Sequence, residues 1–461
     1  MKSLQVKTVS LGGQNTPKEA GRKSNMDDQT TRCRWVSKVL PAVVPNRGKD
    51  ERAKAGVSSL GAVFLIGLLA SALSEAAQPP TVEWERTFGG ASGDSGYCVR
   101  QTADGGYVVV GGTSSFSSTA PLGANVYLIK VEGDGHEQWQ KLLGEGPEMG
   151  SITTGRSIAQ TPDGGYIIAG VLFTPHDGMN VCLIKADTNG NQLWQQVYGL
   201  NPEDPSEEIG ESVDLTTDGG FIVAGHGTPP TTASVQLYLL KTNSSGTLQW
   251  FRHFGGGGSD EGYCARQTTD GGYIVAGLTG SYGAGNDDLY LIKTDSSGTL
   301  QWEKTFGGTL QDRGRSVLQT PDGGYIVAGM TNSFHWPDIE VYLVKTDSSG
   351  TLQWEHTFNG GRDAYCIQPT ADGGYIVAGM AYVIGRGEEV YLLKTDRDGM
   401  KQWETTLGGV NDDQAYCVRQ TTDGGFLVVG QTQSFGAGST DVYIVKLAPR
   451  AMATGFWTLY D

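Results

Sequence analysis

The segments TPDGGYIVAG at residues 320–329 and VYLVKTDSSGTLQW at residues 341–354 define a unit that recurs along the chain. The tetrad Asp-Gly-Gly-Tyr/Phe occurs seven times at nearly constant spacing, and a tryptophan that follows a Lys-Thr-Asp-x-x-Gly-like turn recurs with the same period. Such a period is typical of an array of one supersecondary unit. The tetrads begin at Asp104, Asp163, Asp218, Asp270, Asp322, Asp372 and Asp423, and the tryptophans are Trp84, Trp139, Trp194, Trp250, Trp302, Trp354 and Trp403.

Each unit predicts four short antiparallel strands, which in the fifth unit span residues 314–320, 325–329, 341–346 and 352–358. Runs rich in β-branched and aromatic residues between Gly, Asp and Ser turns are typical of strands. The Asp-Gly-Gly and Asp-x-x-Gly turns supply residues that tolerate positive φ, as tight hairpins require. Because the second strand is apolar on both faces, it must be covered on both sides, as it is between stacked blades.

The two ends of the array complement each other. Residues 81–88 form a lone fourth strand, and residues 441–447 end the array on a third strand. Pairing these segments closes a ring and removes two exposed edges, whereas a solenoid needs capping repeats. The sequence therefore predicts an all-β protein, a seven-bladed β-propeller of four-stranded antiparallel blades over residues 81–447, closed by the pairing of 81–88 with the last blade.

The repeat consensus resembles that of uncharacterised secreted prokaryotic propellers built of Asp-Gly-Gly-Tyr repeats. The segment KTDSSGTLQW at residues 345–354 is similar to the docking motif of PQQ-like, quinoprotein-type propeller repeats. The resemblance covers nearly all of residues 81–447 and implies the fold, in a superfamily that includes dehydrogenases and assembly-factor scaffolds. Quinoprotein dehydrogenases usually have eight blades and a vicinal cysteine pair, whereas this chain has seven units and no Cys-Cys, so no cofactor is predicted.

The N-terminal region predicts export. The apolar stretch LGAVFLIGLLASAL at residues 60–73 follows four basic residues and precedes small ones, which is the pattern of a signal peptide. We assign the signal peptide to residues 58–77 and expect a secreted, extracytoplasmic protein; the alternative is a membrane anchor formed by the same residues, although the stretch is short for a span. We expect residues 1–57 to be an unstructured or mis-annotated N-terminal extension, with the true translation start near Val43 or Val44, and residues 448–461 to be a C-terminal tail.

The charge distribution narrows the class of partner. The chain has 34 Lys/Arg and 50 Asp/Glu, of which residues 1–77 carry 12 and 6, so the remainder has a net charge of −22. Nucleic-acid binding requires a cationic surface that displaces phosphate counterions, so no nucleic-acid partner is expected. Ring closure leaves no free edge, and we expect a monomer.

The connections between successive units are acidic. If the first strand of each unit is innermost, several of these carboxylates ring the mouth of a central channel, where they would concentrate cations and hold a hard ion such as calcium. The favoured alternative is that each carboxylate caps its own turn. The candidate binding residues are Asp94, Glu208, Asp260, Asp312, Asp363 and Asp413.

The loops between the second and third strands carry an aromatic residue in most units. Such residues can stack on sugar rings or peptide side chains, although they more often fold back over the blade. The densest cluster is Phe334-His335-Trp336, and it is the first choice for a contact site, with Tyr282 and Phe435 in other units.

Cysteine and serine alternate at one position of the first strand. Interchange of two small residues marks a tightly packed position that faces the neighbouring blade. The spacing does not match a metal motif, so we expect free, buried thiols rather than a metal site. The alternative is a disulfide between Cys417 and either Cys366 or Cys98, which have neighbouring positions around the closed ring. The cysteines are Cys98, Cys264, Cys366 and Cys417, and the serines are Ser157, Ser212 and Ser316.

These observations favour a secreted, non-catalytic binding or scaffold propeller that recognises a protein, glycan or cation through its acidic, loop-rich face. The alternative is an extracellular enzyme, such as a polysaccharide lyase or hydrolase or a quinoprotein-like protein, with its site at the channel mouth. The sequence has no H-E-x-x-H, G-x-S-x-G or phosphate-loop motif. Ionisable residues converging in one pocket would favour an enzyme, and an even distribution around the ring would favour a scaffold.

Overall fold

A computed structural model describes residues 78–116, 125–144, 152–176, 178–199, 207–229 and 234–449. The predicted extension 1–57, the signal peptide 58–77 and nearly all of the tail 448–461 lie outside these residues. The described chain contains no helix that is long and apolar enough to cross a membrane.

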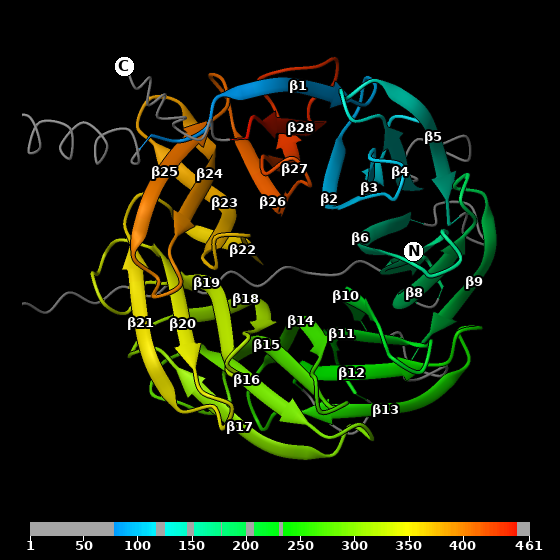
Figure 1. The fold of residues 1–461 in the computed structure, drawn as a ribbon. Coiled ribbons are helices and arrows are strands. Elements are labelled where there is room, and N and C mark those ends of the chain that lie inside the picture. Colours follow the sequence, from blue (N-terminus) through cyan, green and yellow to red (C-terminus); the bar gives the residue numbers. More distant parts are fainter. Residues whose placement is uncertain are drawn as a thin grey trace, which may run out of the picture. The chain divides into compact units, whose positions relative to one another are not determined.

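Seven four-stranded antiparallel sheets form the blades of a ring, which confirms the predicted fold class (Figure 1). The first three blades comprise β2 (Asp94–Gln101), β3 (Tyr107–Thr113), β4 (Asn125–Val131) and β5 (Glu137–Leu143); β6 (Ile152–Gln160), β7 (Tyr166–Thr174), β8 (Gly178–Ala186) and β9 (Gln192–Tyr198); and β10 (Glu208–Leu215), β11 (Phe221–Gly227), β12 (Gln236–Thr242) and β13 (Leu248–Phe254).

Blades four to six comprise β14 (Asp260–Gln267), β15 (Tyr273–Thr279), β16 (Asp288–Thr294) and β17 (Leu300–Phe306); β18 (Asp312–Gln319), β19 (Tyr325–Thr331), β20 (Glu340–Thr346) and β21 (Leu352–Phe358); and β22 (Asp363–Pro369), β23 (Tyr375–Val383), β24 (Gly387–Thr395) and β25 (Lys401–Leu407). The first strand of each blade lies nearest the ring centre (Figure 1).

The seventh blade is closed by the N-terminal strand, as predicted. It contains β26 (Asp413–Gln420), β27 (Phe426–Thr432) and β28 (Asp441–Leu447), and its fourth strand is β1 (Val82–Phe88). The strands β1 and β28 pair antiparallel, with Trp84 opposite Lys446 and Phe88 opposite Val442. The two ends of the described propeller are therefore joined through one sheet.

The repeated tryptophan packs one blade against the next. Trp250, on the outer strand β13, lies with its ring centroid 5.7 Å from that of Tyr273 in the following blade. A Cβ atom at Gly298, in a turn of that same following blade, would lie 2.7 Å from Trp250, so the indole requires glycine there. Gly298 also has a φ of 78°, which glycine adopts without strain. The tryptophan and the Asp-x-x-Gly turn are thus explained by packing and backbone geometry.

A buried lysine holds each Asp-Gly-Gly turn to its blade. In the fourth blade Lys293 is 3% exposed, and its Nζ donates to Asp270 Oδ2 at 2.8 Å and to Gln301 Oε1 at 3.0 Å. The lysine therefore connects the first turn, the third strand and the fourth strand. The seven pairs join Lys130, Lys185, Lys241, Lys293, Lys345, Lys394 and Lys446 to the aspartate of the same blade's tetrad.

Removing one of these aspartates should destabilise the fold. Asp372→Ala leaves Lys394, which is 4% exposed, with only the neutral acceptors Thr395 O and Gln402 Oε1. We expect a loss of about 1–3 kcal/mol, the cost of a buried polar group deprived of its partner. Asp398→Ala, in an exposed turn of the same blade, is the control and should change stability by less than about 0.5 kcal/mol. Urea unfolding measures both, and equal losses would contradict the role of the pair.

The same pairs predict acid sensitivity. Burial alone would raise the pKa of Asp270, but hydrogen bonds from Lys293, Thr268 and the Gly272 amide lower it to about 2; the pKa values of Asp104, Asp163, Asp218 and Asp322 are likewise lowered to about 2. Because these folded-state pKa values lie below the unfolded value of about 3.9, their stabilisation is present above pH 4 and is lost as the pH falls towards 2.

We therefore expect the urea midpoint to fall steeply between about pH 4 and pH 2. Asp270→Asn, which cannot titrate, should show a smaller change over the same interval. A midpoint that stays constant through this interval would contradict the prediction.

Candidate functional site

The seven innermost strands enclose a cavity of about 300 Å³ in the central channel. Every one of these strands has a β-bulge at the same place, for example between Gly96 and Cys98 in β2. A bulge changes the direction of a side chain, so two successive residues, such as Tyr97 and Cys98, both line the cavity. The channel lining therefore includes residues at positions that strict alternation would turn away.

Arginine is the most frequent charged residue of the lining. Arg156 Nη1 lies 3.9 Å from Glu211, Arg266 Nη1 lies 3.7 Å from Asp214, and Arg315 Nη2 lies 3.3 Å from Asp363. Burial would lower the pKa of Arg315, but Asp363 raises it above its usual value, so the guanidinium stays charged. The five arginines are Arg100, Arg156, Arg266, Arg315 and Arg419.

Two of these guanidiniums have no carboxylate within ion-pair distance in the described part of the chain. Arg100 Nη1 and Arg419 Nε both donate to the carbonyl oxygen of Val99, at 3.2 and 3.3 Å. In addition, the described protein supplies no hydrogen-bond acceptor to the buried Arg156 Nε, Arg266 Nη1 and Arg315 Nε. The lining thus has an excess of positive charge, and several of its guanidinium N–H donors have no acceptor in the described protein.

Four tyrosines separate the arginines around the cavity. The rings of Tyr97 and Tyr416 lie 5.1 Å apart, and those of Tyr365 and Tyr416 lie 5.2 Å apart. The Arg315 guanidinium lies 4.4 Å from the ring centroid of Tyr263, at cation–π distance. Burial raises the pKa of Tyr365 to about 12, so its phenol is neutral, and its hydroxyl donates to Met380 Sδ at 3.8 Å.

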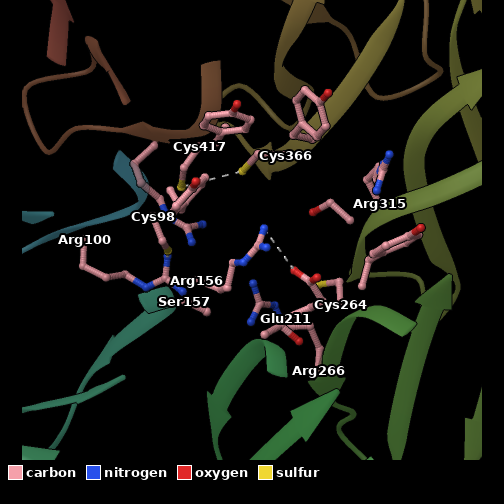
Figure 2. A pocket seen from close by; sticks show the side chains of 17 residues that line it. Cys98, Arg100, Arg156, Ser157, Glu211, Cys264, Arg266, Arg315, Cys366 and Cys417 are labelled. Atoms are coloured by element: carbon pink, nitrogen blue, oxygen red, sulfur yellow. Dashed lines mark hydrogen bonds and ion pairs between the residues drawn. The ribbon is translucent and has the colours of Figure 1, made fainter. Parts of the chain in front are cut away.

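Thiols and hydroxyls occupy the next position of the inner strands and face the neighbouring blade, as predicted. The Cys264 thiol donates to Val317 O at 3.9 Å, and Ser212 Oγ accepts from the Ala265 amide at 3.0 Å. All four cysteines of this position are free and buried, which confirms that prediction. Figure 2 shows the sulfur atoms of Cys366 and Cys417 facing one another, 3.9 Å apart, and the ion pair between Arg156 and Glu211.

The carboxylates proposed as a cation-binding ring are at most 4% exposed. Asp260 Oδ2, for example, accepts from the Gly256 amide at 2.9 Å and from Ser281 Oγ at 2.7 Å, so it joins two loops of its own blade region. Asp363 instead pairs with Arg315 in the channel wall. The described residues include no group of three or more His, Cys, Asp or Glu arranged to hold a metal ion. The residues in question are Asp94, Glu208, Asp260, Asp312, Asp363 and Asp413.

The aromatic loop residues are about 40% exposed and fold back onto their blades. Phe334 lies 5.5 Å from Tyr342, Tyr282 lies 6.0 Å from Tyr290, and Phe435 lies 5.6 Å from Tyr443. These contacts correspond to the alternative in which the aromatic ring covers the blade.

The remaining members of the aromatic cluster have different environments. His335 Nδ1 lies 2.7 Å from Glu340 Oε2, whereas Trp336 is 74% exposed. Trp336 is therefore the aromatic residue of this cluster most accessible to a partner, and ligand binding by the loop residues stays a prediction.

Sequence reasoning missed the arginines and tyrosines of the channel. The signal lay one residue before and two residues after the Cys/Ser position of the inner strand, where the repeats differ, whereas the residue directly after the Cys/Ser position is apolar in every unit. The residue immediately before the Cys/Ser position is Tyr97, Arg156, Glu211, Tyr263, Arg315, Tyr365 or Tyr416 in successive units. Variation at a fixed position of a repeat that is otherwise constant could have directed attention there.

No protein-family model matches the sequence, and no curated protein matches it. Among solved structures, a protein of unknown function from Dyadobacter fermentans is 11% identical, with a TM-score of 0.48 over 80% of this chain and 99% of that one. The Pan2 WD40 domain of Neurospora crassa is also 11% identical, with a TM-score of 0.48 over 77% and 90%. A structure described as YCF48 bound to D1 peptide is 10% identical, with a TM-score of 0.44 over 81% and 100%. These similar structures are β-propeller proteins.

Proposed function

We propose that the protein is a binding propeller whose central channel takes an anionic ligand, either a small organic anion or an anionic group of a larger partner. The observation that carries this proposal is the excess of guanidinium over carboxylate in the channel, with Arg100 and Arg419 lacking an acidic partner in the described residues. Guanidinium N–H groups match the oxygens of carboxylate, phosphate and sulfate, often two bonds at a time.

The surroundings strengthen the attraction for an anion. The cavity lies within the ring, where charges are screened less by water than they are at an exposed surface. The hydroxyls of Tyr263, Tyr365 and Tyr416 already donate to Glu261, Met380 and Gln414, but their rings line the cavity. A ligand that joins an anionic group to a flat or apolar body therefore fits the lining better than a bare ion.

A cation or a glycan at the acidic, loop-rich face, as the sequence suggested, is the weaker proposal. Asp94, Asp260, Asp312 and Asp413 already accept hydrogen bonds from loop amides and serine hydroxyls. A calcium ion would have to compete with those donors. A protein partner that inserts an acidic side chain or its C-terminal carboxylate into the channel would be both the protein ligand expected from the sequence and the anionic ligand proposed here. Secretion of the protein also remains a proposal, because residues 58–77 lie outside the described chain.

The enzyme alternative has partial support, because ionisable groups do converge in one cavity. Among the described residues that line it, however, Glu211 is the single carboxylate, and it is paired with Arg156. A general acid and a general base would need two groups that titrate near neutral pH. The lining is better suited to binding an anion than to acid–base catalysis.

Anion binding is tested by stability measurements at constant ionic strength. Sulfate, phosphate and phenyl phosphate are titrated against chloride, and a ligand at 100 times its Kd should stabilise the protein by about 2.7 kcal/mol. The double variant Arg100→Gln/Arg419→Gln should lose this effect while remaining at least as stable without ligand, because it removes mutual repulsion. Arg252→Gln, an exposed arginine over Trp250 on the outer strand β13, is the control and should behave like the parent.

Two outcomes contradict the proposal. One is the absence of stabilisation by every anion beyond that of chloride. The other is equal stabilisation of the parent and of the double variant, which would place the anion elsewhere on the protein.

A further inference from the structure

Three of the channel cysteines belong to neighbouring blades. Cys366, Cys417 and Cys98 lie at the same bulged position of β22, β26 and β2, which follow one another around the closed ring. The Sγ atoms of Cys366 and Cys417 are 3.9 Å apart. Cys264 lines the same cavity at the same position, but its neighbouring blades have Ser212 and Ser316 there. The ring thus contains a thiol cluster and an isolated thiol in otherwise matched positions.

The environment of Cys98 favours its thiolate. Arg100 Nη1 lies 3.5 Å from Cys98 Sγ, and this guanidinium has no carboxylate partner in the described residues. A hydrogen bond with Cys417 lowers the pKa of Cys98 most, burial opposes it, and the charge of Arg100 lowers it further, so that the pKa lies well below its usual value. Cys417, in contrast, has its pKa raised by its contacts with the other two thiols and by burial. The thiolate is the nucleophilic form of cysteine.

We propose that Cys98 is a reactive thiol that forms mixed disulfides with anionic disulfides drawn into the channel. The proposal rests on the anion-binding function of the channel. The Cys98 thiolate attacks one sulfur of the disulfide R–S–S–R, a new bond forms between Cys98 Sγ and that sulfur, and the old S–S bond breaks with release of R–S⁻. The disulfide is the oxidant, and the negative charge of the Cys98 thiolate passes to the departing R–S⁻. No further oxidant or proton is required.

Access through the channel gives the reaction its selectivity. Cys98 is 7% exposed, so a reagent reaches it from the cavity that the five arginines line. A reagent with carboxylate groups is attracted and oriented by these guanidiniums, and a cationic reagent is repelled. Near Arg100 the departing thiolate is also stabilised, which speeds the exchange.

The test measures the rate of thiol–disulfide exchange with three reagents of different charge. They are dianionic 5,5′-dithiobis(2-nitrobenzoate), uncharged 4,4′-dithiodipyridine and cationic cystamine, and the adduct is located by mass spectrometry of peptides. All proteins carry Cys33→Ser, because Cys33 lies outside the described residues. Burial raises the pKa of Cys182 to about 12, so this thiol should react slowly.

We expect one equivalent of thiol to react rapidly with the dianionic reagent, at least about tenfold faster than with cystamine, and to carry the adduct on Cys98. Cys98→Ser should abolish the fast phase, and three blades already have serine at this position, so the variant is expected to fold. Cys264→Ser is the matched control and should retain the phase. Arg100→Gln should slow the dianionic reagent by about tenfold and the uncharged one by less.

A fast phase that survives in Cys98→Ser, or equal rates with the anionic and cationic reagents, would overturn the inference. The binding of unreactive sulfate or phenyl phosphate to Cys98→Ser is measured in parallel. Retained binding in that variant, together with a failed exchange experiment, would leave the proposed function intact and reject only the reactivity of Cys98.

Discussion

The ring depends on one repeated contact, the packing of an outer-strand tryptophan against the following blade. Trp250 lies against Tyr273 and against Gly298, where any side chain would clash with the indole. The same arrangement occurs at Gly190 beneath Trp139 and at Gly350 beneath Trp302. Because every blade meets its neighbour in nearly the same way, the angle between blades is nearly constant, and seven of them close with β1 completing the last sheet.

This uniform outer framework allows the inner strands to differ from one another. Each blade is held internally by a buried lysine and its aspartate, and between blades by the tryptophan, so the repeated contacts that build the ring do not involve the variable side chains of the channel. The bulge in each inner strand then presents one variable residue to the cavity. The residues of the proposed binding site are thereby separated from those that determine the fold.

The sequence was sufficient for the architecture. The seven tetrads and seven tryptophans predicted the number of blades. A lone fourth strand at residues 81–88 and a last unit that ends on its third strand at 441–447 predicted how the ring closes. The interchange of Cys and Ser predicted a buried position between blades. The sequence was not sufficient for the site, because a β-bulge in the inner strand determines where the side chains of Arg156 and Tyr263 point, and the sequence analysis did not predict this bulge. The carboxylate of Asp260 looked available in sequence because its partners, Gly256 and Ser281, lie in two different loops.

The charge of the channel contrasts with that of the whole chain, whose net charge is −16. An anion is repelled by the protein at long range and is attracted at short range by guanidiniums that are weakly screened in the cavity. High salt weakens the first effect more than the second. The ligand best suited to this combination of long-range repulsion and short-range attraction is compact, and its charge lies on oxygens that can accept hydrogen bonds from several arginines.

The most direct test of this account is the position of a bound anion in crystals grown with sodium selenate. Anomalous scattering from selenium locates the ion without any assumption about the site. The account predicts a peak inside the channel, with selenate oxygens about 2.8–3.0 Å from the guanidinium nitrogens of Arg100, Arg266 or Arg419. A channel without a peak, in crystals where selenate is bound only at the outer surface, would contradict it.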